Sequence, residues 1–183
     1  MGVGVDEVVV AFEYLYENLL NREYAKSAGF EDYSERELYH IVRAFLLGYF
    51  WDNMRSELAT SLPGASTGVG RIDFVVGKVA VELAVRKRGS RGKRKLCAAE
   101  NETEVKKLLR WKGPGLLVLY DFSAPSLTMA DLARYRTLPT LGSGNWHTSS
   151  FQVAYFHREG RPSEPKITRL RIRSAPQAAR ETA

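Results

Sequence analysis

Two carboxylates, Asp73 and Glu82, occur in the segment GRIDFVVGKVAVELAVRK (residues 70–87) at a spacing suited to holding a metal ion. Gly77-Lys78 separates two short apolar runs, and a Gly-X pair is typical of a two-residue hairpin turn. In such a hairpin Asp73 falls opposite Glu82, with Cβ atoms roughly 4.5–5.5 Å apart. Like charges at this distance repel, and a divalent cation offsets the repulsion, because Mg²⁺ favours one or two carboxylates and keeps water and a phosphate as its other ligands. Bound in this way, the ion activates water and stabilises charge on a phosphoryl group.

The remaining side chains of the hairpin divide between two faces in this register. One face is entirely apolar and is expected to be core. It comprises Ile72, Phe74, Val81 and Leu83. The carboxylates lie on the other face, where the alternative to a metal site is a solvated surface balanced by Arg71 and Arg86.

The elements around the hairpin predict an α/β fold with a mixed central β-sheet flanked by helices. Apolar residues recur at three- and four-residue steps over residues 5–25, which predicts a helix. A second helix is expected from Ser34, where Glu37 three residues later completes a capping box. The other expected elements are a strand in the latter half of 51–62, strands at 71–76 and 79–86, a helix at 101–111, a strand buried on both faces at 115–122, a short helix at 129–135, and strands at 151–158 and 166–173.

Three segments are expected along the chain. Residues 1–30 hold the N-terminal helix, which is apolar over much of its circumference and is a candidate packing or dimerisation element. Residues 31–173 form the α/β domain, and residues 174–183 a flexible tail.

Composition favours an anionic partner. The chain has 183 residues, a formal net charge of +6 and a pI of about 9.5, which points first to nucleic acid. The single cysteine, Cys97, excludes a disulfide framework or a cysteine-rich zinc site within the chain. The N-terminal residues lack a basic leader and no run reaches the roughly 18 apolar residues of a membrane span. We therefore expect a soluble, cytoplasmic protein with no membrane partner.

With this order of elements, residues 34–122 resemble the αβββαβ core of the PD-(D/E)xK, or restriction-endonuclease-like, nuclease superfamily. The resemblance is carried by GRIDFVV, VAVELAV, the helical segment ETEVKKLLRW and the strand LLVLYDF. It implies that Asp73 and Glu82 bind Mg²⁺ or Mn²⁺ and that the protein hydrolyses phosphodiester bonds in DNA. It also implies a further acidic catalytic residue on the preceding helix. Glu37 is the first candidate, with the capping box as its alternative role, and Glu35 and Glu57 are its rivals.

Ala84 departs from the superfamily pattern, because it stands where the motif has its lysine. In the family that lysine orients the attacking water and stabilises charge on the phosphate. Lys107, on the helix expected at 101–111, is the first candidate to supply the missing cation. Lys106 points about 100° away on the same helix, so one of the two can serve. Arg71 lies opposite Ala84 and is nearer, although a guanidinium is a poor proton carrier.

The segment RKRGSRGKRK (residues 86–95) has seven basic residues in ten and no acidic residue. Such a segment is expected to contact phosphates, with salt-dependent affinity and without base readout. The predicted nucleic-acid contacts are Arg86, Lys87, Arg88, Arg91, Lys93, Arg94 and Lys95.

Two further features have open interpretations. Arg169, Arg171 and Arg173 alternate along an expected strand and place three cations on one face. They would extend the same surface or meet an acidic partner. Trp146 and His147 lie in a polar, glycine-rich loop, where base stacking by Trp146 is one interpretation and a buried anchor the other.

Three functions follow from these patterns. The first is a Mg²⁺-dependent nuclease acting on DNA. The second is a catalytically inactive module on the same fold that binds nucleic acid. The third is a protein-interaction subunit, forming a homodimer through the N-terminal helix. Cleavage and binding assays on DNA separate them.

Overall fold

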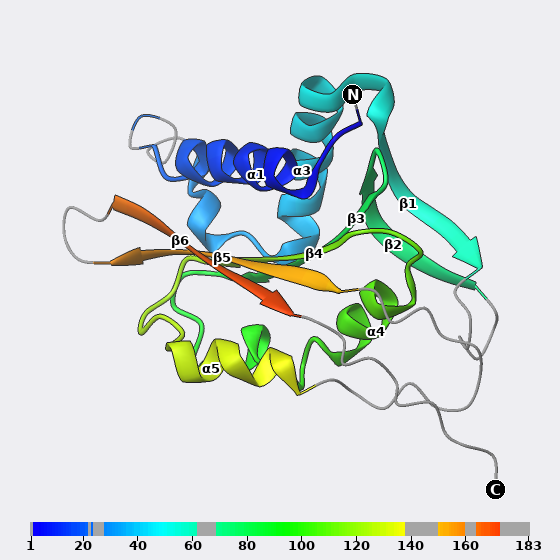
Figure 1. Ribbon diagram of the computed structural model, residues 1–183. Helices are drawn as coiled ribbons and strands as arrows, with labels where there is room; N and C mark the ends of the chain where they lie inside the picture. Colours follow the sequence, from blue (N-terminus) through cyan, green and yellow to red (C-terminus); the bar gives the residue numbers. More distant parts are fainter. Residues whose placement is uncertain are drawn as a thin grey trace, which may run out of the picture.

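The computed structural model describes residues 2–21, 23, 28–61, 69–137, 150–159 and 164–172. Six strands form one mixed sheet in which neighbours in the chain are also neighbours in space (Figure 1). The pairs β1–β2, β2–β3 and β5–β6 are antiparallel. The pairs β3–β4 and β4–β5 are parallel. The strands are β1 (Met54–Ser61), β2 (Val69–Val76), β3 (Val79–Arg86), β4 (Gly115–Asp121), β5 (Phe151–Glu159) and β6 (Glu164–Ile172).

Helices cover both faces of the sheet, so the predicted α/β fold with a mixed, helix-flanked sheet is confirmed. α1 (Val5–Leu19) and α3 (Glu35–Phe50) lie on one face, and α4 (Glu102–Arg110) and α5 (Met129–Ala133) on the other. Short 3₁₀ turns occur at Phe30–Asp32, Trp51–Asn53, Arg94–Leu96 and Arg134–Arg136. β1 begins at Met54, earlier than the expected strand, directly after one of these turns.

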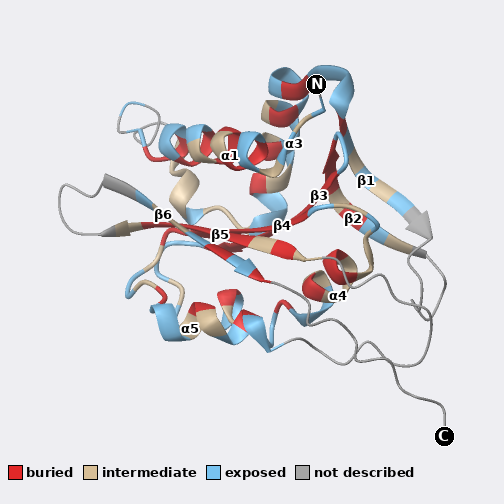
Figure 2. Ribbon diagram, in the orientation of Figure 1, coloured by how far each residue is buried: buried red, intermediate tan, exposed pale blue. Residues whose placement is uncertain are grey.

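The central strands are buried on both faces, as the apolar run 115–122 predicts. Every residue of β3 and β4 is buried, and Figure 2 shows them as the innermost elements. Side chains of β3 alternate between two cores. Val79, Val81, Leu83 and Val85 face α1 and α3, while Ala80 and Ala84 face α4. Glu82 and Arg86 therefore share the α4 face with Ala84.

The N-terminal helix is part of the main core. Seven of its residues are buried, and they belong to the same apolar cluster as the α3 and β3 side chains. The Tyr16 hydroxyl donates to the Asp121 carbonyl at 2.7 Å, and the Tyr120 hydroxyl to the Phe12 carbonyl at 2.6 Å. Packing against the core, one of the two roles expected for residues 1–30, therefore explains why α1 is apolar over most of its circumference. Its role in a homodimer stays a prediction.

The hairpin has the predicted turn and the predicted register for the three pairs next to it, but the expected pairs Asp73–Glu82 and Ile72–Leu83 are not part of the ladder, and Ile72 was assigned to the wrong face. Val76 pairs with Val79 and Phe74 with Val81, and the β2–β3 ladder ends there. Ile72 packs in the cluster on the α4 side, not with Phe74. The reason lies at the contact with the neighbouring strand β1. Glu57 and Asp73 do not pair in the β1–β2 ladder, and the backbone of Glu57 has a positive φ of 48°. This local break in the pleat reverses the alternation of side chains.

Candidate active site

Asp73 and Glu82 meet where strands β2 and β3 separate. Asp73 Oδ2 accepts a hydrogen bond from the backbone N–H of Leu83 at 3.0 Å, so its side chain takes the place of a strand ladder contact. Burial raises the pKa of Asp73, and the Leu83 backbone N–H and the neighbouring Glu82 carboxyl oppose this rise without cancelling it. Glu82 is fully buried, so the predicted alternative of a solvated surface is wrong for this residue. The two carboxyls form a close pair.

Lys107 reaches this pair from α4. Its Nζ lies 2.8 Å from Glu82 Oε2, and the lysine side chain is 21% exposed. The helix is placed by three buried residues, Val105, Leu108 and Leu109, which pack against the sheet. Lys106 instead pairs with Glu102 on the outer side of α4 at 2.6 Å. Lys107 therefore lies beside Glu82, and it comes from the helix that was expected to supply a cation in place of the lysine missing at position 84.

The electrostatics of the pair leave Glu82 incompletely satisfied. Burial raises the pKa of Glu82 well above its ordinary value, and the Asp73 charge raises it further. Burial opposes the charged form of Lys107, but the charge and hydrogen bond of Glu82 outweigh it and raise the Lys107 pKa. Glu82 Oε1 is buried and has no hydrogen-bond partner among the residues that the structure describes. A buried carboxylate oxygen in this condition is costly unless a proton or a cation approaches it.

Glu35 is the acidic residue of α3 that lies with Asp73. It borders a hollow of about 400 Å³ together with Tyr39, Glu57 and Asp73, and also Arg36 and His40. Partial desolvation raises the Glu35 pKa, and the Asp73 charge adds to this, while a hydrogen bond from the Val85 backbone opposes it. Both rivals of Glu37 named from the sequence, Glu35 and Glu57, therefore border the same hollow as Asp73.

Glu37 occupies the capping box instead. Its Oε2 accepts hydrogen bonds from the backbone N–H and the hydroxyl of Ser34, both at 2.6 Å, and its side chain is exposed. These bonds lower the Glu37 pKa. The predicted catalytic place of Glu37 is therefore corrected to a structural one, because its carboxylate is turned to the helix N-terminus.

Glu104 is a further charged residue near the Asp73–Glu82 pair, and it was not among the candidates named from the sequence. Its charge acts on the pKa values of Glu35, Asp73, Glu82 and Lys107. It lies three residues before Lys107 on α4, a spacing that puts the two side chains on one helix face. That spacing in ETEVKK was the signal available in the sequence.

The donor set limits how a metal ion could be held. Within the described part of the chain, no group of three or more His, Cys, Asp or Glu side chains is arranged for a metal. Asp73 and Glu82 supply two carboxylates, one with an oxygen that lacks a partner. This set fits Mg²⁺ or Mn²⁺, which take one or two protein carboxylates and fill their other positions with water and phosphate. It does not fit a closed structural site.

Arg86 is not part of an exposed basic surface, so its predicted nucleic-acid contact is wrong. The residue is 1% exposed, and its guanidinium binds both carboxylate oxygens of Asp121 at 2.6 and 2.7 Å. It also donates to the carbonyls of Gly92 and Pro125, at 3.1 and 2.7 Å. Arg86 is the last residue of β3, a strand buried on both faces, and its burial could not be predicted from the charge of the segment.

Acidic residues from other elements neutralise part of the basic segment. Arg88 pairs with Glu31 and Asp32, Lys93 with Asp131 at 2.7 Å, and Arg94 with Glu100 at 3.0 Å. Lys87, Arg91 and Lys95 are exposed. The charges of Lys87 and Lys95 act on Glu37 and Glu35 respectively. The predicted phosphate surface is thus reduced to these three side chains and the outer faces of the paired ones.

The remaining candidates fall elsewhere. Arg169 and Arg171 are exposed on β6, and Arg169 pairs with Asp6 of α1 at 3.2 Å. Trp146, His147 and Arg173 lie outside the described residues. Among the described residues, no helix combines the length and apolar character needed to cross a membrane.

No protein family, curated protein or solved structure matches this chain. The geometry of the site and the resemblance of its motifs therefore carry the functional argument.

Proposed function

We propose that the protein is a metal-dependent nuclease that hydrolyses phosphodiester bonds in DNA, with a PD-(D/E)xK-like site in which Lys107 replaces the motif lysine. The observation that supports this most is the contact of Lys107 Nζ with Glu82 Oε2 at 2.8 Å, beside a Glu82 Oε1 that is buried without a partner. A cation and an unsatisfied carboxylate oxygen meet where the resemblance requires a lysine and a metal ligand.

Asp73 and Glu82 would hold Mg²⁺ or Mn²⁺. When bound, the ion supplies charge stabilisation at the phosphoryl oxygens and lowers the pKa of a coordinated water. It would also relieve the like-charge repulsion between the two carboxyls, which contributes to the raised pKa of Glu82.

Lys107 keeps a positive charge at the site. Its ammonium has three N–H donors, of which the contact with Glu82 uses one, so others are available to a phosphate oxygen or to water. The raised pKa of Lys107 keeps the group protonated at neutral pH. It is therefore suited to stabilising developing charge rather than to removing a proton.

Glu35 would act at the outer edge of the site. Its carboxylate borders the hollow next to Asp73 and is suited to accepting a hydrogen bond from a water that approaches the pair. Groups of this kind orient the groups that act directly, and their loss commonly costs about 10–100-fold in metal affinity or activity.

The exposed cations of the 86–95 segment would contact the DNA backbone near this site. Lys95 is close enough to Glu35 for its charge to act on that carboxyl. A nucleic-acid substrate is consistent with the cytoplasmic location expected from the sequence. Homodimerisation through α1 would use the exposed side of that helix, where Tyr14 is the large exposed side chain. The candidate site would stay open, since its residues are on α3, β2, β3 and α4.

The proposal is tested by incubating the protein with supercoiled, linear, single-stranded and branched DNA, with Mg²⁺ or Mn²⁺ and with a chelator. We expect metal-dependent cleavage that Asp73→Asn abolishes. Lys106→Ala is a matched control, because Lys106 pairs away from the site. Persistent cleavage by Asp73→Asn, or cleavage in the chelator, would overturn the proposal.

The second candidate is a catalytically inactive nuclease-fold module that binds nucleic acid or a protein partner. The observation that favours it is the small donor set, two carboxylates with no third acidic, histidine or cysteine ligand grouped with them in the described residues. Binding without cleavage for every substrate and metal would support this candidate over the first.

A further inference from the structure

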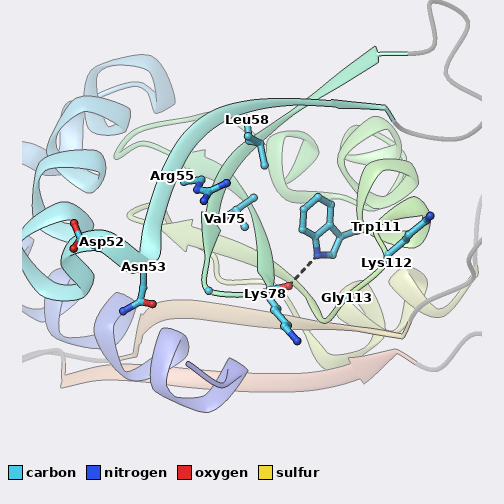
Figure 3. Close-up of a pocket in the computed structure, with 10 residues that line it drawn as sticks. Asp52, Asn53, Arg55, Leu58, Val75, Lys78, Trp111, Lys112 and Gly113 are labelled. Atoms are coloured by element: carbon cyan, nitrogen blue, oxygen red, sulfur yellow. Dashed lines mark hydrogen bonds between the residues drawn. The ribbon is translucent and has the colours of Figure 1, made fainter. Parts of the chain in front are cut away.

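A second hollow, of about 350 Å³, lies at the turn of the β2–β3 hairpin, beside the end of α4 (Figure 3). Its apolar wall consists of Leu58, Val75 and Trp111, and in Figure 3 the two aliphatic side chains lie facing the indole ring. Its polar rim consists of Asp52, Asn53, Arg55, Lys78 and Lys112, with Gly77 and Gly113 completing the lining. The hollow is separate from the one that Asp73 borders.

The indole ring of Trp111 is held in place. Its Nε1 donates to the Lys78 carbonyl at 3.0 Å, drawn as a dashed line in Figure 3. Gly113 makes this approach possible, since a Cβ there would lie 2.6 Å from the Lys78 carbonyl oxygen and 2.8 Å from Trp111 Nε1. The ring therefore stands as a fixed aromatic wall that leaves part of its surface to the hollow.

The rim has three cations and one acidic residue. Arg55, Lys78 and Lys112 are exposed, and none of the ion pairs among the described residues involves them. One acidic residue, Asp52, contributes to the lining. This differs from the 86–95 segment, where several cations are already paired with acids of the same chain.

We propose that this hollow binds an unpaired nucleotide of a single-stranded nucleic acid, with the base against Trp111 and the neighbouring phosphates at Arg55, Lys78 and Lys112. An aromatic ring beside cations is the arrangement that binds single strands without sequence preference, because every base has a π face and every nucleotide a phosphate. The volume is in the range of small-ligand pockets, which is adequate for one base. A flat aromatic wall opposite aliphatic side chains suits a planar base better than an acidic peptide.

The hollow and the candidate active site lie along the same two elements. Trp111 directly follows α4 and is four residues from Lys107, about 6 Å along the helix axis, and Lys78 directly precedes β3 and is four residues from Glu82, about 13 Å along the strand. A strand held at Trp111 would therefore pass the Asp73–Glu82 pair. That consequence, a preference for substrates with unpaired nucleotides, rests on the proposed function, whereas binding itself does not.

Binding is measured by the fluorescence anisotropy of a labelled oligothymidylate, in the presence of a chelator so that cleavage does not interfere. We expect Trp111→Ala to weaken binding roughly tenfold to one-hundredfold, the range for loss of one base–aromatic stack. Trp111→Phe keeps a ring and should lose much less, and it also covers the case in which the alanine variant fails to fold. Lys78→Ala and Lys112→Ala should each lower the salt dependence by about one phosphate contact.

Matched controls keep the test specific. Trp51→Ala removes a tryptophan that is 74% exposed and does not border the hollow, and Lys166→Ala removes an exposed lysine on β6, at the opposite edge of the sheet. Both should leave oligothymidylate binding unchanged. Equal losses in these controls, tighter binding of a blunt duplex than of the oligothymidylate, or displacement of the oligothymidylate by an oligoglutamate peptide at equal concentration would overturn the inference.

The two proposals fail in different ways. Metal-dependent cleavage with unchanged binding in the Trp111 and Lys78 variants overturns the nucleotide site alone. Loss of binding in those variants, without cleavage of any substrate, supports the nucleotide site while the nuclease proposal fails.

Discussion

Two buried ion pairs lie on the same face of β3, four residues apart, and they differ in how completely they are satisfied. Arg86 pairs with Asp121 of β4, and Glu82 pairs with Lys107 of α4. Ala84 lies between them on the same face. Arg86, Asp121 and Glu82 are buried, whereas Lys107 is 21% exposed, and the two pairs also differ in their hydrogen bonds.

The Arg86–Asp121 pair has a partner for each carboxylate oxygen. Asp121 Oδ1 accepts from Arg86 Nε and from the Ser123 backbone N–H, at 2.7 and 3.0 Å. Its Oδ2 accepts from Arg86 Nη2 and from the Tyr155 hydroxyl, both at 2.6 Å. A bidentate, fully hydrogen-bonded pair of this kind orders the surrounding strands and loops and leaves no position for a ligand.

The Glu82–Lys107 pair is incomplete. Glu82 Oε1 has no partner, a second carboxyl from Asp73 adjoins it, and Lys107 is partly open to solvent. Incomplete satisfaction of buried charges is unfavourable for stability and typical of sites that bind or react. A structural pair is thus distinguished from a candidate functional one by its complete hydrogen bonding and its exclusion of solvent, while both pairs contain a buried carboxylate and a cation.

The largest expected effect is on the structural pair. Arg86→Met leaves Asp121 buried without its cation, and breaking a buried pair in this way costs about 3–5 kcal/mol in the free energy of unfolding. Urea denaturation followed by circular dichroism measures it. Arg91→Met, at an exposed position of the same basic segment, should change the free energy of unfolding by less than about 0.5 kcal/mol. A loss below about 1 kcal/mol for Arg86→Met would remove the distinction between the two pairs.

Lys107→Met should have the opposite signature, a large effect on activity and a small one on folding. If Lys107 stabilises charge during phosphodiester cleavage, the rate should fall about 10²–10³-fold, as when one preorganised donor is removed elsewhere. Folding should suffer less than in Arg86→Met, because burial and the Asp73 charge raise the pKa of Glu82, so that this carboxyl can take up a proton when its cation is removed. Single-turnover cleavage and urea denaturation of the same preparations measure both. A stability loss as large as that of Arg86→Met would make Lys107 a structural residue.

Local patterns predicted the parts of this molecule that are decided by neighbours in sequence. The Gly77-Lys78 turn, the apolar strand after α4 and the Ser34 capping box all follow from short-range chemistry, and the structure has each of them. Lys107 was predicted to supply a cation at the site, because Ala84 stands where the motif has its lysine and the helix expected at 101–111 could bring another lysine there.

Long-range contacts decided the parts that the sequence did not predict. Arg86 belonged to a run of basic residues, but its partner Asp121 is on another strand. The acids that neutralise Arg88 and Lys93 are likewise distant in sequence. Ile72 changed face because the pleat breaks at Glu57 on a neighbouring strand, which no periodicity within β2 could reveal.

Glu35→Gln and Glu37→Gln sharpen the comparison on α3, where one carboxyl is near the site and the other is engaged at the cap. We expect Glu35→Gln to lower the cleavage rate about tenfold, the lower range for loss of an orienting group. Glu37→Gln should leave cleavage unchanged and lower the melting temperature slightly, because the neutral side chain accepts weaker hydrogen bonds from Ser34. Cleavage assays and thermal unfolding of both variants measure this. A lower cleavage rate in Glu37→Gln alone would restore Glu37 as the catalytic acid residue of α3.

Among the changes to the two buried pairs, Asp73→Asn has the smallest expected effect on the free energy of unfolding, although it should abolish cleavage. Burial and nearby acids raise the pKa of Asp73, so the folded state holds the proton more tightly than the unfolded chain. Stability of the metal-free protein therefore falls as pH rises from the ordinary aspartate pKa, near 4, through the raised value. At neutral pH the asparagine variant lacks this penalty and can still accept from the Leu83 N–H, so we expect its free energy of unfolding to be higher than that of the parent protein. It should also lose the rise in melting temperature that Mg²⁺ produces in the parent protein, whereas Asp121→Asn should be destabilised. A destabilised Asp73→Asn that keeps its Mg²⁺ response would place Asp73 with the structural pair.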